Sequence, residues 1–275
     1  MKPILLPLLT TASLALPLTV QAFTIDGNLN DWGLHQTGSA SDWTPSSGIL
    51  AVVADQNGNP NTFLSPGYGG QAYDAEALYL SFDSSHLYVA LVTGHDPKTK
   101  QNPAANKYAR GDFAIDFGKD GSWDFGILTA FRNGFDLGSV VATGNGDWDV
   151  GLWSAPGVLA TAQTPSPYVT AVHGGDWVGQ ANLKIANSAV GNMGTLGGSH
   201  WVYELEIPVD VFGGQWGPDG PTQAFNIQWT MLCANDVITL DPPPAAAPAA
   251  SVPEPGSLAL TGLGLAGLLG LRRRG

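Results

Sequence analysis

The sequence contains a single cysteine, Cys233, so the chain cannot form an internal disulfide. Its stability must therefore come from a packed core or from bound metal. Cys233 lies in the apolar stretch "IQWTMLCAND", with no basic residue close in sequence that would activate the thiol. We expect a buried, inert side chain rather than a nucleophile.

Basic residues are also scarce. Residues 23–240 contain 21 acidic and 7 basic residues, a net charge of −14 with histidine neutral. A surface of this sign repels nucleic acid and anionic lipid headgroups and attracts cations. We therefore expect no nucleic-acid partner.

Glutamate is rare among the acids, and helical periodicity is absent from the body of the chain. Only 4 of the 23 acidic residues are Glu, whereas the sequence has 36 Gly and 20 Pro. Asp, Gly and Pro favour turns over helix interiors. Only the apolar segment near the C-terminus has a helical pattern sustained over three turns.

Strand patterns fill the space between these turns. The run "ALYLSFDSSHLYVALVTG" predicts a β-hairpin, and "GDFAIDFG" and "WDFGILTAF" predict a second strand pair around "KDGS". Further strand-like runs occupy residues 49–55, 138–142, 168–172, 201–207 and 225–232. Strands about ten residues apart predict an all-β fold over residues 23–240, a two-layer antiparallel β-sandwich of jelly-roll type.

Familiar catalytic motifs are missing. The sequence has no G-x-S-x-G elbow and no H-E-x-x-H pair, and its five histidines are scattered. Glu204 and Glu206 alternate along one predicted strand, so both should lie on the same face, expected to be the solvent face, and too close together for a glycosidase pair. We expect no enzymatic activity.

Two acidic loops are candidate calcium sites. Asp116, Asp120 and Asp124 are spaced four apart around a glycine turn, and Asp55, Asn57 and Asn59 alternate in "DQNGNPN". Oxygen side chains on a tight loop can converge on a hard cation, although neither loop matches the EF-hand pattern. The alternative is that these residues only form hairpin turns. We expect no required cofactor, with Ca²⁺ as a candidate ligand.

Tryptophan is abundant, with nine residues, and four of them directly follow an aspartate. An aromatic ring beside a hydrogen-bond acceptor suits a pyranose ring, which has an apolar face and a polar rim. The predicted ligand-binding residues are Trp32, Trp43, Trp148 and Trp177. The alternative for each is a place in the core, which is the expectation for Trp201 and Trp229 inside strand patterns.

Residues 1–22 are typical of a secretory signal peptide. Lys2 precedes an apolar run that ends in "VQA", which predicts export by the secretory translocon and cleavage by signal peptidase after Ala22. At the other end of the body, residues 241–251, "DPPPAAAPAAS", predict an extended linker.

Residues 252–275 combine a "VPEP" turn, an apolar segment and three arginines. The apolar segment, residues 256–271, would span roughly 24 Å as a helix, against a hydrocarbon core of roughly 30 Å. Five of its 16 residues are Gly, which suits a temporary stop better than a permanent anchor. The arginines would remain cytoplasmic.

This arrangement resembles the PEP-CTERM sorting signal. The resemblance implies one short transmembrane helix, transient anchoring in the inner membrane, processing by an exosortase-type enzyme, and release or attachment at the cell surface. The sorting residues it implies are Pro253, Glu254, Pro255, Arg272, Arg273 and Arg274.

The body is similar to the family 9 carbohydrate-binding-module-like sandwich, also seen in DOMON-like domains. The similar stretches are "IDGNLNDW", "ALYLSFDSSHLYVALVTG" and "WVYELEIPVDVFG". Together with the sorting signal and the missing catalytic motifs, this resemblance leads us to expect a secreted or surface-sorted, non-enzymatic protein that binds extracellular polysaccharide in a biofilm matrix. The alternatives are a structural or adhesive matrix protein without a specific small ligand and, third, a secreted hydrolase.

Overall fold

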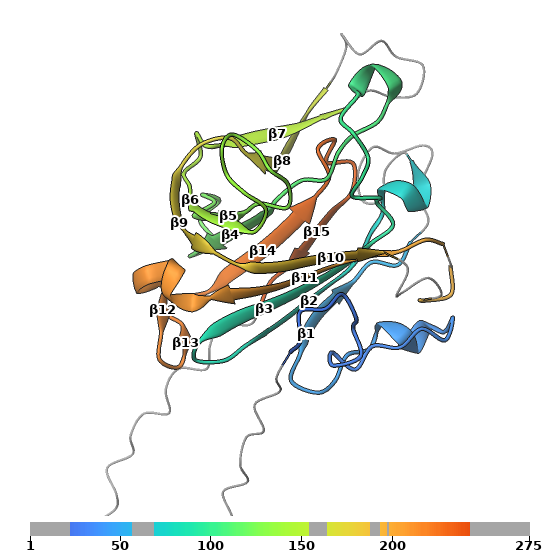
Figure 1. Cartoon of the computed structure of the whole chain (residues 1–275), viewed down its shortest axis with the longest axis horizontal. Coiled ribbons are helices and arrows are strands. Elements are labelled where there is room, and N and C mark those ends of the chain that lie inside the picture. Colours follow the sequence, from blue (N-terminus) through green and yellow to red (C-terminus); the bar gives the residue numbers. More distant parts are fainter. Residues whose placement is uncertain (1–22, 57–68, 154–163, 188–192, 197, 243–275) are drawn as a thin grey trace, which may run out of the picture.

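Two antiparallel sheets pack face to face in the computed structural model of the protein (Figure 1). The structure describes residues 23–56, 69–153, 164–187, 193–196 and 198–242. It confirms the predicted all-β class and the two stacked sheets. The predicted signal peptide, nearly all of the linker and the C-terminal sorting segment lie outside the described residues.

The first sheet has five strands in the order β1-β2-β3-β11-β10, all antiparallel. Its strands are β1 Leu50–Val53, β2 Ala75–Phe82, β3 His86–Thr93, β10 Asn182–Asn187 and β11 Trp201–Pro208.

The second sheet has six strands in the order β15-β14-β4-β5-β6-β9. Its strands are β4 Phe113–Phe117, β5 Phe125–Ile127, β6 Ser139–Ala142, β9 Asp176–Gln180, β14 Phe225–Thr230 and β15 Val237–Leu240. Two small antiparallel pairs complete the strands: β7 Trp148–Trp153 with β8 Thr164–Val172, and β12 Trp216–Gly217 with β13 Gly220–Pro221.

The helices among the described residues are short 3₁₀ turns: η1 Ala40–Trp43, η2 Gly70–Tyr73, η3 Pro103–Ala105 and η5 Val209–Gln215. In this part of the chain no helix has the length and apolar character needed to cross a membrane.

Both predicted strand pairs form. In the β2–β3 hairpin, the Asp83 carboxylate accepts the backbone N–H groups of Ser85 (2.7 Å) and His86 (2.8 Å), which closes the turn. Strands β4 and β5 pair around the turn that contains Gly121. The turns are local and their residues carry the necessary hydrogen-bond acceptors, so sequence alone can identify them.

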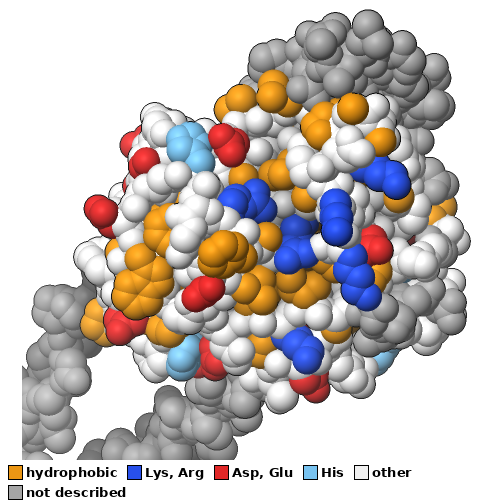
Figure 2. Space-filling model, turned by 45° about the horizontal axis from the view of Figure 1, so that its top comes forward, with side chains coloured by type: hydrophobic (Ala, Val, Ile, Leu, Met, Phe, Trp, Pro, Cys, Tyr) orange, Lys and Arg blue, Asp and Glu red, His pale blue; other side chains and the backbone are white. Residues whose placement is uncertain are grey.

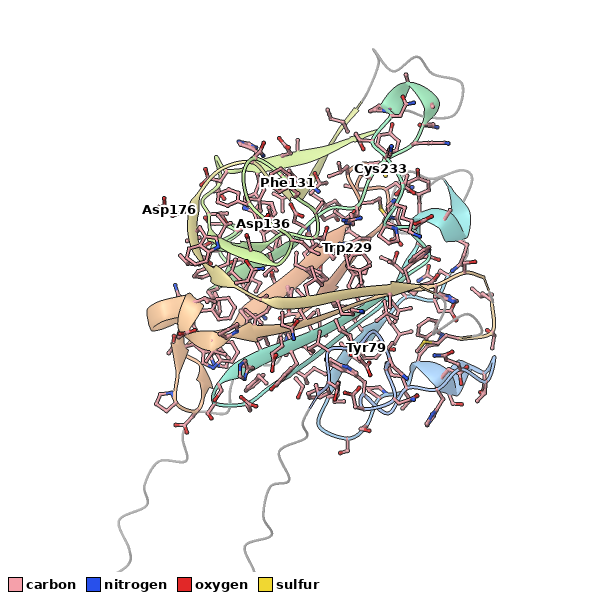
Figure 3. The ribbon with its side chains drawn as sticks, in the orientation of Figure 1. Tyr79, Phe131, Asp136, Asp176, Trp229 and Cys233 are labelled. Atoms are coloured by element: carbon pink, nitrogen blue, oxygen red, sulfur yellow. The ribbon has the colours of Figure 1, made fainter. Side chains whose placement is uncertain are left out.

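The main core fills the space between the two sheets. Leu80, Val89 and Leu205 point into it from the five-stranded sheet, and Ile115 and Trp229 from the six-stranded sheet. The Trp229 indole satisfies its N–H on the backbone carbonyl of Gly111 (3.2 Å). Figure 3 shows Trp229 in this interior and Tyr79 on the other side of the five-stranded sheet.

The outer face of the five-stranded sheet is covered by residues 23–49. Phe23, Leu29 and Trp32 pack there on Tyr79 and Tyr88. Strands β2 and β3 are consequently buried on both faces over most of their length. The expectation that this face is open to solvent is therefore wrong.

The β7–β8 pair covers the outer face of the six-stranded sheet. Trp148 packs with Val141 and Val172 over that face. The fully buried Asp112 carboxylate accepts the N–H groups of Thr129 (2.9 Å) and Val172 (3.0 Å), which ties β8 to the sheet. Each sheet thus has one face on the shared core and the other under its own cover.

Gly111 marks the point where three chain segments come closest. A methyl group there would lie 2.2 Å from the carbonyl oxygen of Thr230 and 2.4 Å from that of Thr170. Both oxygens belong to the backbone, so neither can rotate out of the way.

We predict that Gly111→Ala lowers the free energy of unfolding by at least about 2 kcal/mol, because the methyl group forces the segments apart. The matched control is Gly146→Ala, where a methyl group meets no atom within 4 Å, and whose effect should stay within about 0.5 kcal/mol. Urea titration of both variants is the measurement. Equal stability of the two variants would contradict the packing described for Gly111.

Candidate functional site

Trp32 is in the core rather than on the surface. It is fully buried, and its indole N–H donates to Glu204 Oε1 (2.9 Å). The other oxygen of Glu204 accepts the backbone N–H of Gly27. Burial raises the pKa of Glu204 to about 7, although both donors favour its charged form. Glu204, expected on a solvent face, instead anchors the N-terminal cover.

Trp43 and Trp148 are buried as well, each 5% exposed. The indole of Trp43 donates to Asp55 Oδ2 (2.7 Å), and that of Trp148 to the Thr143 hydroxyl (3.0 Å). The predicted exposure is thus wrong for three of the four tryptophans. Trp177, 59% exposed on the edge strand β9, is accessible, and its ligand role stays a prediction.

The three aspartates of the predicted calcium loop serve the β4–β5 turn. The Asp116 carboxylate accepts the backbone N–H groups of Asp120 (3.2 Å) and Gly121 (3.0 Å), and Asp124 accepts that of Phe117 (2.7 Å). Within the described ranges no group of three or more His, Cys, Asp or Glu residues is arranged to hold a metal ion. The expected convergence is therefore not found. Asn57 and Asn59 of the second loop lie outside the described residues.

Cys233 is buried as predicted. Its thiol lies against Asn235 Oδ1 (3.1 Å), and burial raises its pKa to about 12. The thiolate is therefore not formed at neutral pH, which confirms the expectation of an inert side chain.

A buried acidic cluster joins the ends of the two sheets, and no sequence motif pointed to it. Asp74, Glu76 and Asp236 are each at most 4% exposed. Asp236 Oδ2 accepts the backbone N–H of Ala75 (2.6 Å), and Glu76 Oε1 lies 3.6 Å from the ring of His200.

Burial is the main cause of the altered titration in this cluster. It raises the pKa of Asp74 to about 10, helped by the neighbouring Asp236 carboxyl, and that of Glu76 to about 8, helped by Asp55. No N–H donor of the described residues reaches the oxygens of Asp74, so it is stabilised by keeping its proton and sharing it with Asp236. At neutral pH Asp74 and Glu76 are therefore largely uncharged, and the cluster lies in the interior at the ends of the two sheets.

Accessible charged and aromatic side chains line two adjoining hollows. The first, about 560 Å³, is framed by the edge strand β10, the start of β11 and the loops of the other sheet. Its lining residues are Pro97, Lys98, Arg110, Leu137, Lys184, Ile185, Ala186 and Trp201.

Trp201 forms an aromatic wall of this hollow. It is half-buried, with part of its ring packed on the main core. The ammonium of Lys98 lies 5.9 Å from the centre of the ring, a cation–π contact. The ring is held by the core on one side and adjoins an open hollow on the other.

The second hollow, about 700 Å³, shares Lys98 with the first. It is formed by the β3–β4 connection and η2, and Lys100 and Lys107 line it together with Tyr73 and Asp96. The two hollows therefore adjoin along one side chain.

Five of the seven basic residues of the body line these two hollows. They are Lys98, Lys100, Lys107, Arg110 and Lys184. We call this surface, with Trp201, the basic groove. Figure 2 shows Lys and Arg side chains gathered among hydrophobic ones in the middle of one face. The local charge is thus opposite in sign to that of the body as a whole.

The β3–β4 connection positions these side chains through backbone contacts. Asp96 Oδ1 accepts the N–H of Lys98 (2.8 Å), which fixes the turn before it. Asn102 and Lys107 form a two-bond bridge with η3 at its tip. Arg110 Nε donates to the carbonyl of Thr129 (2.7 Å) and Nη1 to that of Pro97, so the loop is tied to the six-stranded sheet.

Sequence reasoning missed the basic groove, although part of its signal is visible in the sequence. Four of the seven bases of the body fall between residues 98 and 110. Lys184 and Trp201 join them only through the pairing of β10 with β11, in which Trp201 opposes Asn187. The overall negative charge predicts attraction of cations, whereas the groove is locally basic and suits anions.

The PEP-CTERM protein-sorting motif family matches residues 251–274. The chain therefore carries the sorting signal indicated by its "VPEP", apolar and arginine segments. The motif indicates an exported protein that crosses the inner membrane, is processed by an exosortase and is sorted to the cell surface. A search of curated proteins finds no match to the chain.

We predict that Glu76 makes the stability pH-dependent. Its folded pKa of about 8 lies above its ordinary value of 4.5. The neutral form therefore favours folding below pH 4.5, and this stability is lost as the pH rises to about 8. Glu76→Gln should remove this loss and gain a few kcal/mol relative to the wild type at pH 9 but not at pH 4. Denaturant titrations at both values are the measurement, and parallel pH profiles would refute the assignment.

Proposed function

We propose that this surface-sorted protein binds extracellular polysaccharide through the basic groove and has no catalytic role of its own. The sorting motif supports a place outside the cell. The sandwich framework supports a rigid binding surface, since the groove is built from strand ends and tied loops rather than from a free segment.

One observation carries the proposal: the half-buried Trp201 ring beside an open hollow of about 560 Å³. A sugar ring has an apolar face that stacks on an aromatic side chain and a polar rim that needs hydrogen-bond donors. Lys98 and Lys184 line the same hollow and supply such donors.

The burial of Glu204, one of the two alternating glutamates of β11, also favours a binding role over hydrolysis. A glycosidase needs two carboxyl groups facing a cleft. Glu204 is fully buried and bonded to Trp32 and Gly27, so it faces the N-terminal cover instead. The competing role is that of a matrix protein without a specific ligand, which a binding measurement separates from this proposal.

We predict that Trp201→Leu weakens polysaccharide binding about tenfold, because leucine keeps the apolar packing but removes the aromatic face. Phe131→Leu is the matched control, since Phe131 is 72% exposed and does not line the groove. A glycan array followed by calorimetry on the best ligand is the measurement. Circular dichroism checks that both variants fold. If no glycan binds the wild type, the matrix-protein role replaces this one.

We predict that the mature protein lacks both ends of the sequence. The apolar segment is short and glycine-rich, so it suits a temporary stop, and a processing enzyme should cut between Pro253 and Gly256. Mass spectrometry of the protein from its native host should give a chain that begins at Phe23 and ends near this turn. A chain that retains Arg272 to Arg274 and stays in the inner membrane would contradict the sorting mechanism.

A further inference from the structure

The basic groove concentrates positive charge on a strongly acidic body. Lys98, Lys100, Lys107 and Lys184 are exposed, and none of them has a salt-bridge partner among the described residues. The two bases of the body that lie outside the groove differ in this respect, since Lys119 pairs with Asp241 and Arg132 with Asp112. Four lysines against the single Asp96 of the second hollow make this surface locally positive, and a local positive potential attracts an anionic partner.

We propose that the two hollows of the basic groove form one continuous site for an acidic polysaccharide, whose uronic-acid carboxylates pair with the lysines. This inference rests on the proposed polysaccharide binding and names its ligand class. Because the hollows share Lys98, the site takes at least two neighbouring sugars. One sugar stacks on Trp201, and a following sugar lies over Lys100 and Lys107.

The cations that the groove exposes are lysines rather than arginines. Arginine recognises carboxylate and phosphate groups through the planar fork of its guanidinium, whereas lysine acts as a compact point charge. Arg110, the one arginine that lines the groove in the described structure, already donates Nε and Nη1 to the carbonyls of Thr129 and Pro97. Two nitrogens of its guanidinium are therefore engaged by the protein, and the exposed donors are ammonium groups, which can pair with the single charge of a uronic-acid carboxylate without a matching fork.

A sugar polymer also fits this surface better than a nucleic acid. Duplex DNA carries a phosphate charge about every 1.7 Å along its axis. A body with 21 acidic and 7 basic residues repels such a chain over most of its surface. A uronic-acid polymer has at most one charge per sugar and presents an apolar ring face to Trp201, so a local basic groove is sufficient to bind it.

The test is calorimetry of the purified full-length protein with four probes in the same buffer: polygalacturonate oligomers, neutral dextran, dextran sulfate and single-stranded DNA. We expect binding to the polygalacturonate oligomers, with affinity rising from one sugar to two or more and falling as salt is added. Removing two ammonium contacts with Lys100→Gln/Lys107→Gln should weaken this binding at least tenfold. Lys98→Gln should weaken the binding of the disaccharide and of the monosaccharide alike, because Lys98 lines both hollows.

Lys119→Gln is the matched control for Lys98→Gln, because each variant removes one positive charge and Lys119 lies outside the groove. Equal losses for this control and the groove variants would overturn the site. Binding of dextran but not of the polygalacturonate oligomers would overturn the ligand class while leaving polysaccharide binding intact. Tighter binding of dextran sulfate or DNA than of the polygalacturonate oligomers would overturn the choice of carboxylate. If neither polygalacturonate nor dextran binds, the proposed function is overturned as well.

Discussion

Strands β2 and β3 are apolar on both faces, and this single constraint shapes the rest of the fold. One face of their sheet packs on the six-stranded sheet, so the other must be covered by a different part of the chain. Residues 23–49 do this, and Glu204 holds them there by accepting hydrogen bonds from Gly27 and Trp32. Burying a carboxylate costs free energy when it lacks hydrogen-bond donors, whereas a carboxylate that has donors holds those groups firmly in place. The first segment of the body is therefore part of the core.

The same layering decides where a ligand can bind. With both outer faces covered, by residues 23–49 on one side and the β7–β8 pair on the other, the described sandwich keeps its open chemistry at its edges and loop ends. The groove forms where edge strand β10 meets loops tied to the other sheet by Arg110. Because those ties are made by the side chain of Arg110 and not by the lysines, substitutions of the exposed lysines should change binding more than folding.

Local features could be predicted from the sequence, and long-range ones could not. The turn at Asp83 and the burial of Cys233 depend on residues close in sequence. The contact between Gly27 and Glu204 joins residues 177 positions apart, and the alternation around Glu204 is the same as that of a solvent-facing strand. The Asp–Trp pairs led to a wrong prediction of exposed tryptophans for a similar reason. The aspartate of such a pair can accept a hydrogen bond within a turn, as Asp42 does from the Ser39 N–H. The indole that follows can then pack in the core.

Overall charge and local charge carry different information in this protein. A net charge of −14 over residues 23–240 repels polyanions over distances up to about one Debye length, beyond which salt screens the charges. At contact distance the lysines of the groove determine the local potential, so the acidic polysaccharide that we propose would bind only where it contacts the groove closely. This favours a sparsely charged polymer that can stack a ring on Trp201 over a densely charged one. The acidic surface thus contributes to selectivity by rejecting ligands that depend on charge alone.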